Sequence, residues 1–327
     1  MKSFKVLVTD NVASEGLDIL THDGTIEADV RPGIKNSELA QIIGEYDAII
    51  TRSGTAVTAE LLEKPGKLKI IGRAGVGLDN IDIEAASKKG IIVMNAPTGN
   101  TLAATELTLG IMLAAARKIP LASESLKSGK WDRKRFMGIQ LYNKTLGIVG
   151  LGRIGTNVAT RAKGFGMRVV AFDPYIKKSK ADAVGVTLRD TLEELLREAD
   201  VISFHTPLTP ETRNMLTKKE IELAKDGVIF INCARGGIVN ENDLYEALKS
   251  GKVFAAGVDV FEEEPPAPNH PLLTAPRTLF SPHVASMTSG SMARMAELVS
   301  LQVVQVLSGE RPPHVANPDV FGTAPGA

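Results

Sequence analysis

Short runs rich in valine and isoleucine alternate with helical stretches along almost the whole chain. This alternation is typical of parallel βαβ units, in which helices cover both faces of a sheet, so the fold class is α/β. At roughly 150 residues per domain, the 327 residues predict two domains, each large enough to bury its own core. We therefore expect two doubly wound parallel-sheet domains with a cleft between them.

The strand candidates fall into two series. Those of the first hundred residues indicate a small flavodoxin-like sheet: 6–9, 48–51, 69–72 and 91–95. The second series has six members, as a complete dinucleotide-binding Rossmann fold needs: 146–149, 168–172, 201–204, 228–231, 254–258 and 278–280. An amphipathic helix at 289–307 is expected to pack back on the first domain. The predicted domains are 1–98 plus 288–327, and 99–287.

Composition excludes several classes of protein. Lys and Arg number 38, as do Asp and Glu, so no general attraction to nucleic acid or to a membrane surface is expected. No segment approaches about 18 uninterrupted apolar residues, and the start, MKSFKVLVTD, lacks the apolar core of a signal peptide. We expect a cytoplasmic protein. A single cysteine, Cys233, and scattered histidines do not supply paired zinc ligands, so no metal is expected.

A glycine motif follows the strand 146–149 directly and opens a helix. Gly150 permits a tight turn, Gly152 lets a pyrophosphate approach the backbone, and Gly155 lets helix and strand pack closely. The next strand ends at Asp173, 18 residues after Gly155, where a carboxylate accepts both ribose hydroxyls and repels a 2′-phosphate. The spacing therefore favours NAD over NADP.

Polar and reactive residues follow the later strands of this half, at the edge where open α/β sheets bind ligands. In chain order they are His205-Thr206-Pro207, the run Asn232-Cys233-Ala234-Arg235-Gly236-Gly237, then Asp259, Glu264 and Ser281-Pro282-His283.

Three of these residues suggest a reaction. The guanidinium of Arg235 is suited to hold a carboxylate bidentately. His283 is suited to remove a hydroxyl proton as hydride leaves the same carbon, and Glu264, fixed by the prolines after it, would orient His283. Glu262 and Glu263 are better explained as a solvated acidic loop, and His205 as a cofactor-side or packing residue.

The chain resembles the D-isomer-specific 2-hydroxyacid dehydrogenase family over nearly its whole length. The matching segments are GRAGVGLDNIDIEAASKKGIIVMNAPTGNT, KTLGIVGLGRIG, INCARGGIVNENDL, AAGVDVFEEEP and SPHVAS. The stretch APTGN favours the phosphoglycerate dehydrogenase branch. That branch implies NAD-dependent oxidation of D-3-phosphoglycerate to 3-phosphohydroxypyruvate, the first step of serine biosynthesis. The resemblance also implies a short form, without the C-terminal regulatory domain that many members carry.

The resemblance assigns roles residue by residue. The family's catalytic set falls on Arg235, Glu264 and His283. Cofactor contacts are implied for Gly150, Gly152, Arg153, Ile154, Gly155, Asp173, His205, Thr206, Pro207, Cys233, Ala234, Arg235, Asp259, His283 and Ser286. A phosphorylated 2-hydroxy or 2-oxo acid would meet Arg52, Ser53, Arg73, Gly75, Val76, Asn100, Arg235 and His283. The first domain would thus bind substrate and the second NAD.

Two alternatives stay open at this stage. Ala285, two residues after the catalytic histidine, stands where phosphoglycerate dehydrogenases commonly have glycine, which favours a glyoxylate or hydroxypyruvate reductase. A protein of another class, an NAD(H)-sensing binding protein, shares the fold.

A helix at 101–116, apolar nearly all round, and the family resemblance both predict a homodimer.

Overall fold

The structure, a computed structural model, describes residues 3–22 and 24–322. The chain forms two compact units. The first comprises residues up to Asn100 and those from Met287 onward, and the second spans Thr101–Ser286. The chain thus leaves the first unit once and returns to it, with junctions at residues 100 and 286, close to the predicted 98 and 287.

The first unit contains a five-stranded parallel sheet in the order β2-β1-β3-β4-β5. Its strands are β1 (Phe4–Val8), β2 (Ile26–Val30), β3 (Ala48–Thr51), β4 (Ile70–Arg73) and β5 (Ile92–Asn95). This order is the flavodoxin-like one that was predicted. The edge strand β2 was missed, because its sequence IEADV carries two acids and most of it is not buried.

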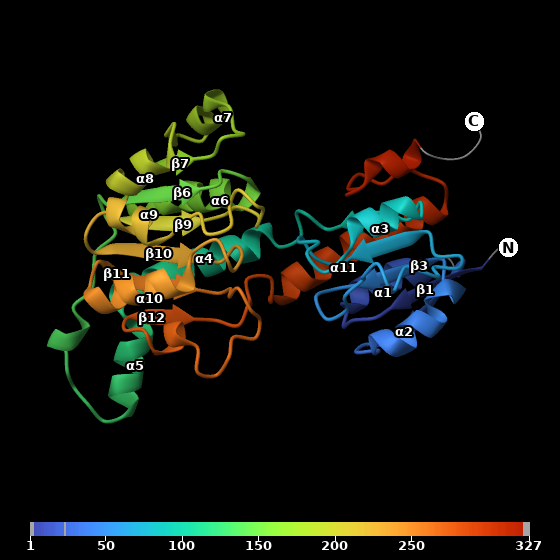
Figure 1. Ribbon diagram of the computed structural model, residues 1–327, viewed down its shortest axis with the longest axis horizontal. Helices are drawn as coiled ribbons and strands as arrows, with labels where there is room; N and C mark the ends of the chain where they lie inside the picture. The colour runs from blue at the N-terminus through green and yellow to red at the C-terminus, as the bar shows by residue number, and fades with distance from the viewer. Residues whose placement is uncertain (1–2, 23, 323–327) are drawn as a thin grey trace. The chain divides into compact units, whose positions relative to one another are not determined.

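Helices cover both faces of this first sheet: α1 (Ser14–Thr21), α2 (Asn36–Ile42), α3 (Ile83–Lys88) and α11 (Ser289–Leu307), with the short turns η1 (Ile43–Glu45) and η5 (Pro318–Phe321). Side chains alternate along β1: Leu7 packs with Leu39 of α2, whereas Val6 and Val8 pack with Leu20 of α1 and Val299 of α11. This period of two is what a strand buried on both faces requires. Helix α11 therefore completes the core of the first unit (Figure 1).

The second unit contains a seven-stranded parallel sheet in the order β12-β11-β10-β9-β6-β7-β8. Its strands are β6 (Thr145–Val149), β7 (Arg168–Phe172), β8 (Thr187–Leu188), β9 (Val201–Phe204), β10 (Val228–Asn232), β11 (Val253–Val258) and β12 (Thr278–Phe280). All but β8 were predicted, and β8 has only two residues. The strand order reverses between β6 and β9, and this switch point is where doubly wound sheets bind ligands.

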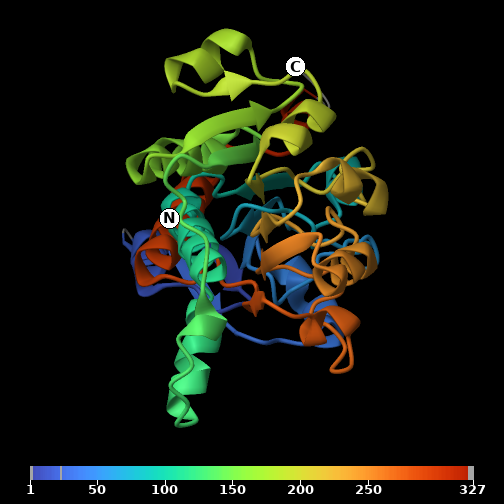
Figure 2. The same cartoon turned by 90° about the vertical axis from the view of Figure 1, so that its left-hand side faces the viewer.

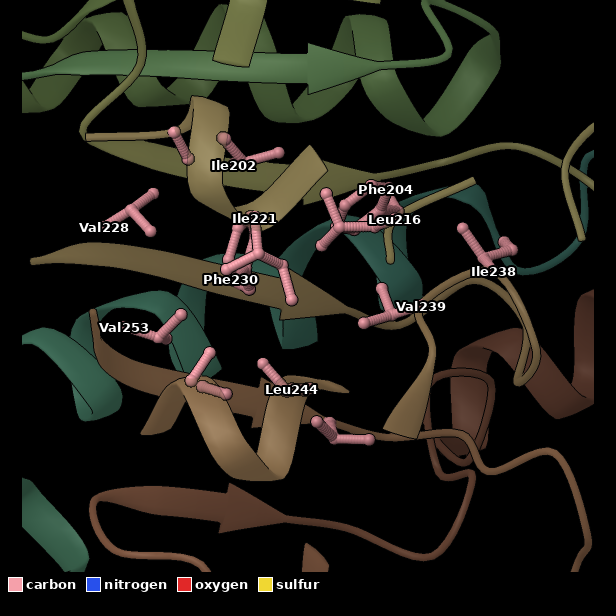
Figure 3. Close-up of a cluster of buried hydrophobic side chains, with 14 of the residues drawn as sticks. Ile202, Phe204, Leu216, Ile221, Val228, Phe230, Ile238, Val239, Leu244 and Val253 are labelled. Atoms are coloured by element: carbon pink, nitrogen blue, oxygen red, sulfur yellow. The ribbon is translucent and has the colours of Figure 1, made fainter. Parts of the chain in front are cut away.

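The second unit has the following helical elements: α4 (Thr101–Arg117), α5 (Ile119–Lys127), η2 (Lys134–Phe136), α6 (Arg153–Ala162), η3 (Lys163–Phe165), α7 (Lys178–Ala183), α8 (Leu192–Glu198), α9 (Lys218–Leu223), α10 (Glu241–Ser250) and η4 (Pro271–Thr274). One face of the sheet packs against α4 and α6, and the other against α8, α9 and α10. Figure 3 shows the second of these cores, where Phe204 and Phe230 approach with ring centroids 6.2 Å apart. Both cores hold the loops at the carboxyl edge in place.

Helix α4 is buried along most of its length, as its apolar sequence predicted, although Leu102 is exposed. No helix among the described residues is long and apolar enough to cross a membrane.

Candidate active site

The glycine motif lies at the switch point of the second sheet. Gly150 follows β6 with φ of 92°, and a Cβ there would come within 2.8 Å of the His205 carbonyl oxygen, which follows β9. A Cβ at Gly155 would overlap the Gly150 carbonyl oxygen. Both positions therefore require glycine, one for its conformation and one for the close approach of α6 to β6.

The start of α6 is arranged to face an anion. Gly152 is its N-cap residue and makes no side-chain cap, so no side chain covers the first amides of this ten-residue helix. A Cβ at Gly152 would meet no protein atom within 4 Å, so the open side of the turn remains accessible. Arg153 and Ile154 are the first residues of the helix. These features fit the pyrophosphate of a dinucleotide.

Asp173 lies one residue beyond β7 and braces the glycine turn. Its Oδ2 accepts a hydrogen bond from the Leu151 amide at 2.8 Å, and its Oδ1 accepts from the Tyr175 amide at 2.9 Å. A carboxylate has about four acceptor positions, so two amides leave capacity for ribose hydroxyls. The placement fits the predicted role and adds a structural one.

In the loop after β9, the side chain of His205 has a hydrogen-bond partner, and that of Thr206 has none among the described residues. His205 Nε2 is 2.9 Å from Ser203 Oγ, and burial lowers the pKa of His205 to about 4, so this imidazole is neutral near pH 7. The Thr206 hydroxyl is buried and has no hydrogen-bond partner among the described residues. An orphaned hydroxyl at the switch point fits a ligand contact, whereas a neutral His205 is ill suited to carry charge. Pro207 follows them, exposed.

Arg235 lies on a tight loop after β10. The buried Asn232 shapes this loop, since its side chain accepts from the Ala234 amide at 3.1 Å and donates to the Arg235 carbonyl at 2.9 Å. Arg235 Nη1 donates to the Ala234 carbonyl at 2.6 Å. A Cβ at Gly236 would overlap the carbonyl of Phe261, so this loop lies directly against the loop after β11.

Cys233 lies on the same loop as an inert thiol. Burial raises its pKa to about 12, with the nearby Asp259 acting in the same direction. Because the thiolate is the reactive form, Cys233 contributes shape and apolar surface at this edge of the sheet.

Glu264 and His283 come together as the sequence predicted. Glu264 Oε2 lies 2.7 Å from His283 Nδ1, and Glu264 Oε1 accepts from the Phe261 amide at 3.1 Å. Because a carboxylate only accepts, Nδ1 carries the proton of the neutral ring, and Nε2 keeps its lone pair. Both side chains are accessible, at 38% and 44% exposure. This geometry is suited to general-base chemistry at Nε2.

Asp259 holds the turn that carries His283. This fully buried carboxylate accepts from Ser281 Oγ at 2.5 Å and from the amides of Val284 and Ala285 at 2.9 and 3.0 Å. His283 itself has φ of 52°, a conformation that non-glycine residues adopt only when their surroundings impose it. Asp259 therefore positions His283, whatever contact it also makes with a cofactor. Ser286 ends the same segment, partly buried.

The predicted substrate residues of the first unit gather around two turns. Arg52 and Ser53 follow β3, and burial lowers the pKa of Arg52. Arg73 ends β4, and Gly75 and Val76 follow it, bonded to the Ala96 amide and the Asn95 side chain. Asn100 Oδ1 is buried and has no hydrogen-bond partner among the described residues. The unit thus presents two arginines and an unsatisfied acceptor.

Two residues with no predicted role, Asp10 and Asn80, hold these turns. Asp10 Oδ2 accepts from the Arg52 amide at 2.7 Å and from Thr51 Oγ1 at 2.9 Å. Asn80 accepts from Arg73 Nε at 3.3 Å and donates to the Arg52 carbonyl at 2.6 Å. Asp10 follows the first strand, so the strand-end rule applied to the second half would have found it here too.

Comparison with known proteins assigns the chain and its fold to a family. Residues 109–285 match the D-isomer specific 2-hydroxyacid dehydrogenase, NAD binding domain. This chain belongs to the D-isomer specific 2-hydroxyacid dehydrogenase family. Its second unit is the NAD-binding one, and the cofactor is NAD.

Relatives cover nearly all of this 2-hydroxyacid dehydrogenase chain. The D-3-phosphoglycerate dehydrogenase of Methanocaldococcus jannaschii is 51% identical over 313 residues, which are 96% of this chain and 59% of that protein. The chain thus spans about three fifths of the length of that curated relative. The crystal structure of TT0316 protein from Thermus thermophilus has a TM-score of 0.88 at 38% identity and covers 95% of this chain and 99% of its own. A glyoxylate reductase from Paecilomyes thermophila has a TM-score of 0.88 at 29% identity, with 98% and 99% covered.

Two glycine substitutions should affect different properties: Gly152→Ala the affinity for NADH, and Gly155→Ala the stability of the second unit. The methyl group of Gly152→Ala meets no protein atom, so the melting temperature should change by less than about 2 °C while NADH affinity falls about tenfold or more. Gly155→Ala overlaps the Gly150 carbonyl and should destabilise the second unit by about 1–3 kcal/mol. Thermal unfolding without cofactor and NADH fluorescence titration separate the two effects. Unchanged NADH affinity in Gly152→Ala would contradict the assignment of this turn to the pyrophosphate.

Proposed function

We propose that this chain catalyses NAD-dependent oxidation of D-3-phosphoglycerate to 3-phosphohydroxypyruvate, the first step of serine biosynthesis, in the cytoplasm. The observation that carries the proposal is the pair Glu264–His283 on the same sheet edge as Arg235 and the glycine turn. Relatives named D-3-phosphoglycerate dehydrogenase, at 42–51% identity over most of the chain, support the substrate. In this proposal the first unit binds the phosphorylated acid and the second unit binds NAD.

Each of the three catalytic residues has one task in this reaction. His283 Nε2 accepts the proton of the substrate hydroxyl while the hydrogen on the same carbon leaves with its electron pair. Glu264 accepts the Nδ1 proton in a hydrogen bond and stabilises the imidazolium that forms. The guanidinium of Arg235 binds the carboxylate and so fixes which face of the carbon is presented.

The residues of the second unit that would hold NAD lie at the switch point and at the neighbouring strand ends: Gly150, Gly152, Arg153, Ile154, Gly155, Asp173, Thr206, Cys233 and Asp259. When bound, the nicotinamide ring supplies the acceptor for the hydride. Because His205 is neutral, it adds no charge to the candidate site. The protonation of His283 is then the change of charge among the side chains of this site.

The substrate assignment is tested by NADH consumption with three acids: phosphohydroxypyruvate, hydroxypyruvate and glyoxylate. We expect kcat/KM to be at least about a hundredfold higher for the phosphorylated acid. A cationic site built to pair with the phosphate is left unpaired when the bound acid has none. Arg52→Ala should remove most of that preference. An unchanged preference in Arg52→Ala would remove this residue from the phosphate site.

The second candidate is a glyoxylate or hydroxypyruvate reductase. Ala285, buried with its amide bonded to Asp259, is the feature that favours it, together with the similarity to a glyoxylate reductase. Preference for an unphosphorylated acid in the same assay would select this candidate and leave the roles of His283 and Arg235 unchanged. Turnover of none of the three acids would favour an NAD(H)-sensing binding protein.

His283→Gln should lower kcat by about 10²–10⁴-fold, because the base that takes the hydroxyl proton is lost. Affinity for NADH should change by less than about threefold, since the side chain of His283 is accessible and is held by its hydrogen bond with Glu264. Steady-state kinetics and fluorescence titration measure the two quantities. Near-normal turnover would exclude His283 as the base.

We further propose that the chain forms a homodimer through α5 and the segment after it, residues 128–137. Helix α5 has no buried residue, and its neighbourhood exposes Leu126, Trp131 and Met137 at 56%, 79% and 76%. In both views this segment projects from the layers of the second unit (Figure 1 and Figure 2). An exposed apolar stretch of this kind is typical of a contact between proteins, and a second copy supplies the same surface.

Sedimentation velocity at micromolar concentration tests the dimer. We expect a dimer for the parent chain and a monomer for Leu126→Glu, because a charge would have to be buried in the contact. Tyr142→Ser, which changes a side chain that is 61% exposed outside this segment, is the matched control and should stay dimeric. A monomeric parent chain would contradict the proposal.

A further inference from the structure

Glu241 and His270 form a partly buried pair behind the loop that carries Glu264. Glu241 is the first residue of α10, and His270 precedes η4. Glu241 Oε2 lies 3.0 Å from His270 Nε2, and the side chains are only 13% and 22% exposed. Burial raises the pKa of Glu241, so the position carries a cost that its contacts must offset.

Both members of this pair hold the residues just before Glu264. The second oxygen of Glu241, Oε1, accepts from the Glu262 amide at 2.7 Å. The ring of His270 meets the buried ring of Phe261 edge to face, with centroids 6.0 Å apart. The Phe261 amide in turn donates to Glu264 Oε1, and Glu264 Oε2 bonds His283. An unbroken series of contacts therefore runs from Glu241 to the imidazole.

A purely structural role for Glu241 does not account for these contacts. An acid in the first turn of α10 interacts favourably with the helix dipole, but Asp243 in the same turn supplies that interaction and accepts from the Lys218 amide at 2.8 Å. Glu241 is directed instead to the acidic loop. The other charged contact of that loop, Arg213 with Glu262 at 2.7 Å, is half exposed and contributes little.

We propose that Glu241 and His270 are positioning residues for the Glu264–His283 pair. They fix the backbone of Phe261 and Glu262, and so determine whether the Glu264 carboxylate reaches His283 Nδ1. The proposal rests on the proposed function for its kinetic consequence only, because the hydrogen bond between Glu264 and His283 is observable without any substrate.

The experiment compares three variants of the full chain: Glu241→Ala, Glu241→Gln and the matched control Asp243→Ala. In proton NMR of protein labelled with ¹⁵N-histidine, the chain's five histidines give a small set of imidazole signals, and His283→Gln identifies that of Nδ1–H. Glu241→Ala should lose or broaden this signal and lower kcat by about 10–100-fold with little change in KM for NADH, since a displaced base mainly costs turnover. Glu241→Gln keeps an acceptor for the Glu262 amide and should restore both.

Asp243→Ala should keep the His283 signal and kcat, although it loses a hydrogen bond of the same kind. If Glu241→Ala behaves like Asp243→Ala in both readouts, the proposal is wrong. Should Glu241→Ala not fold, as judged by thermal unfolding, His270→Leu carries the same test, because it removes the pair and leaves Glu241 in place. Failure of all three acids as substrates, with the His283 signal still lost in Glu241→Ala, would refute the proposed function and retain the positioning role.

Discussion

The buried carboxylate of Asp259 is the constraint on which the candidate active site depends. A charge without solvent is costly unless donors surround it, and here the turn 281–285, folded over the end of β11, supplies them. That turn places His283 at a positive φ. The hydrogen bonds that satisfy the buried Asp259 thus maintain the positive φ of His283. The side chain of His283 therefore needs no buried contact of its own.

Close approach of backbone segments shapes the switch point between β6 and β9. The chain leaves β6 through Gly150 so close to the loop after β9 that a methyl group has no room, and Gly155 brings α6 equally close to Gly150. On the opposite side of the turn Gly152 faces open space. Glycines of one motif therefore serve two different purposes, and the motif indicates a binding site because only its middle member leaves the backbone uncovered.

Much of this could be predicted from the sequence because its signals are local. Strands such as VISF and VIFIN are fully buried, and the residues after them are polar, so the carboxyl edge of the second sheet could be found by strand ends alone. Strand β2 was missed since an edge strand half exposed to solvent needs no apolar run. Asp10 follows β1 and so was within reach of the same strand-end rule. Asn80 and Glu241 were missed for a different reason. Each acts by accepting a backbone amide or holding another side chain across the fold, and no pattern in a single chain records a partner that distant.

Three carboxylates of the second unit differ in the number and kind of hydrogen-bond donors around them. This difference distinguishes a carboxylate that holds the backbone from those that can still bind a ligand or assist a reaction. Asp259 has three donors and no exposure, so its charge is committed to the backbone. Asp173 has two amides and keeps free acceptor positions. Glu264 has one amide and one imidazole, and the imidazole alone can gain charge during a reaction. In the proposed reaction, Glu264 would stabilise the imidazolium that forms on His283, and of these three carboxylates it has the fewest competing donors.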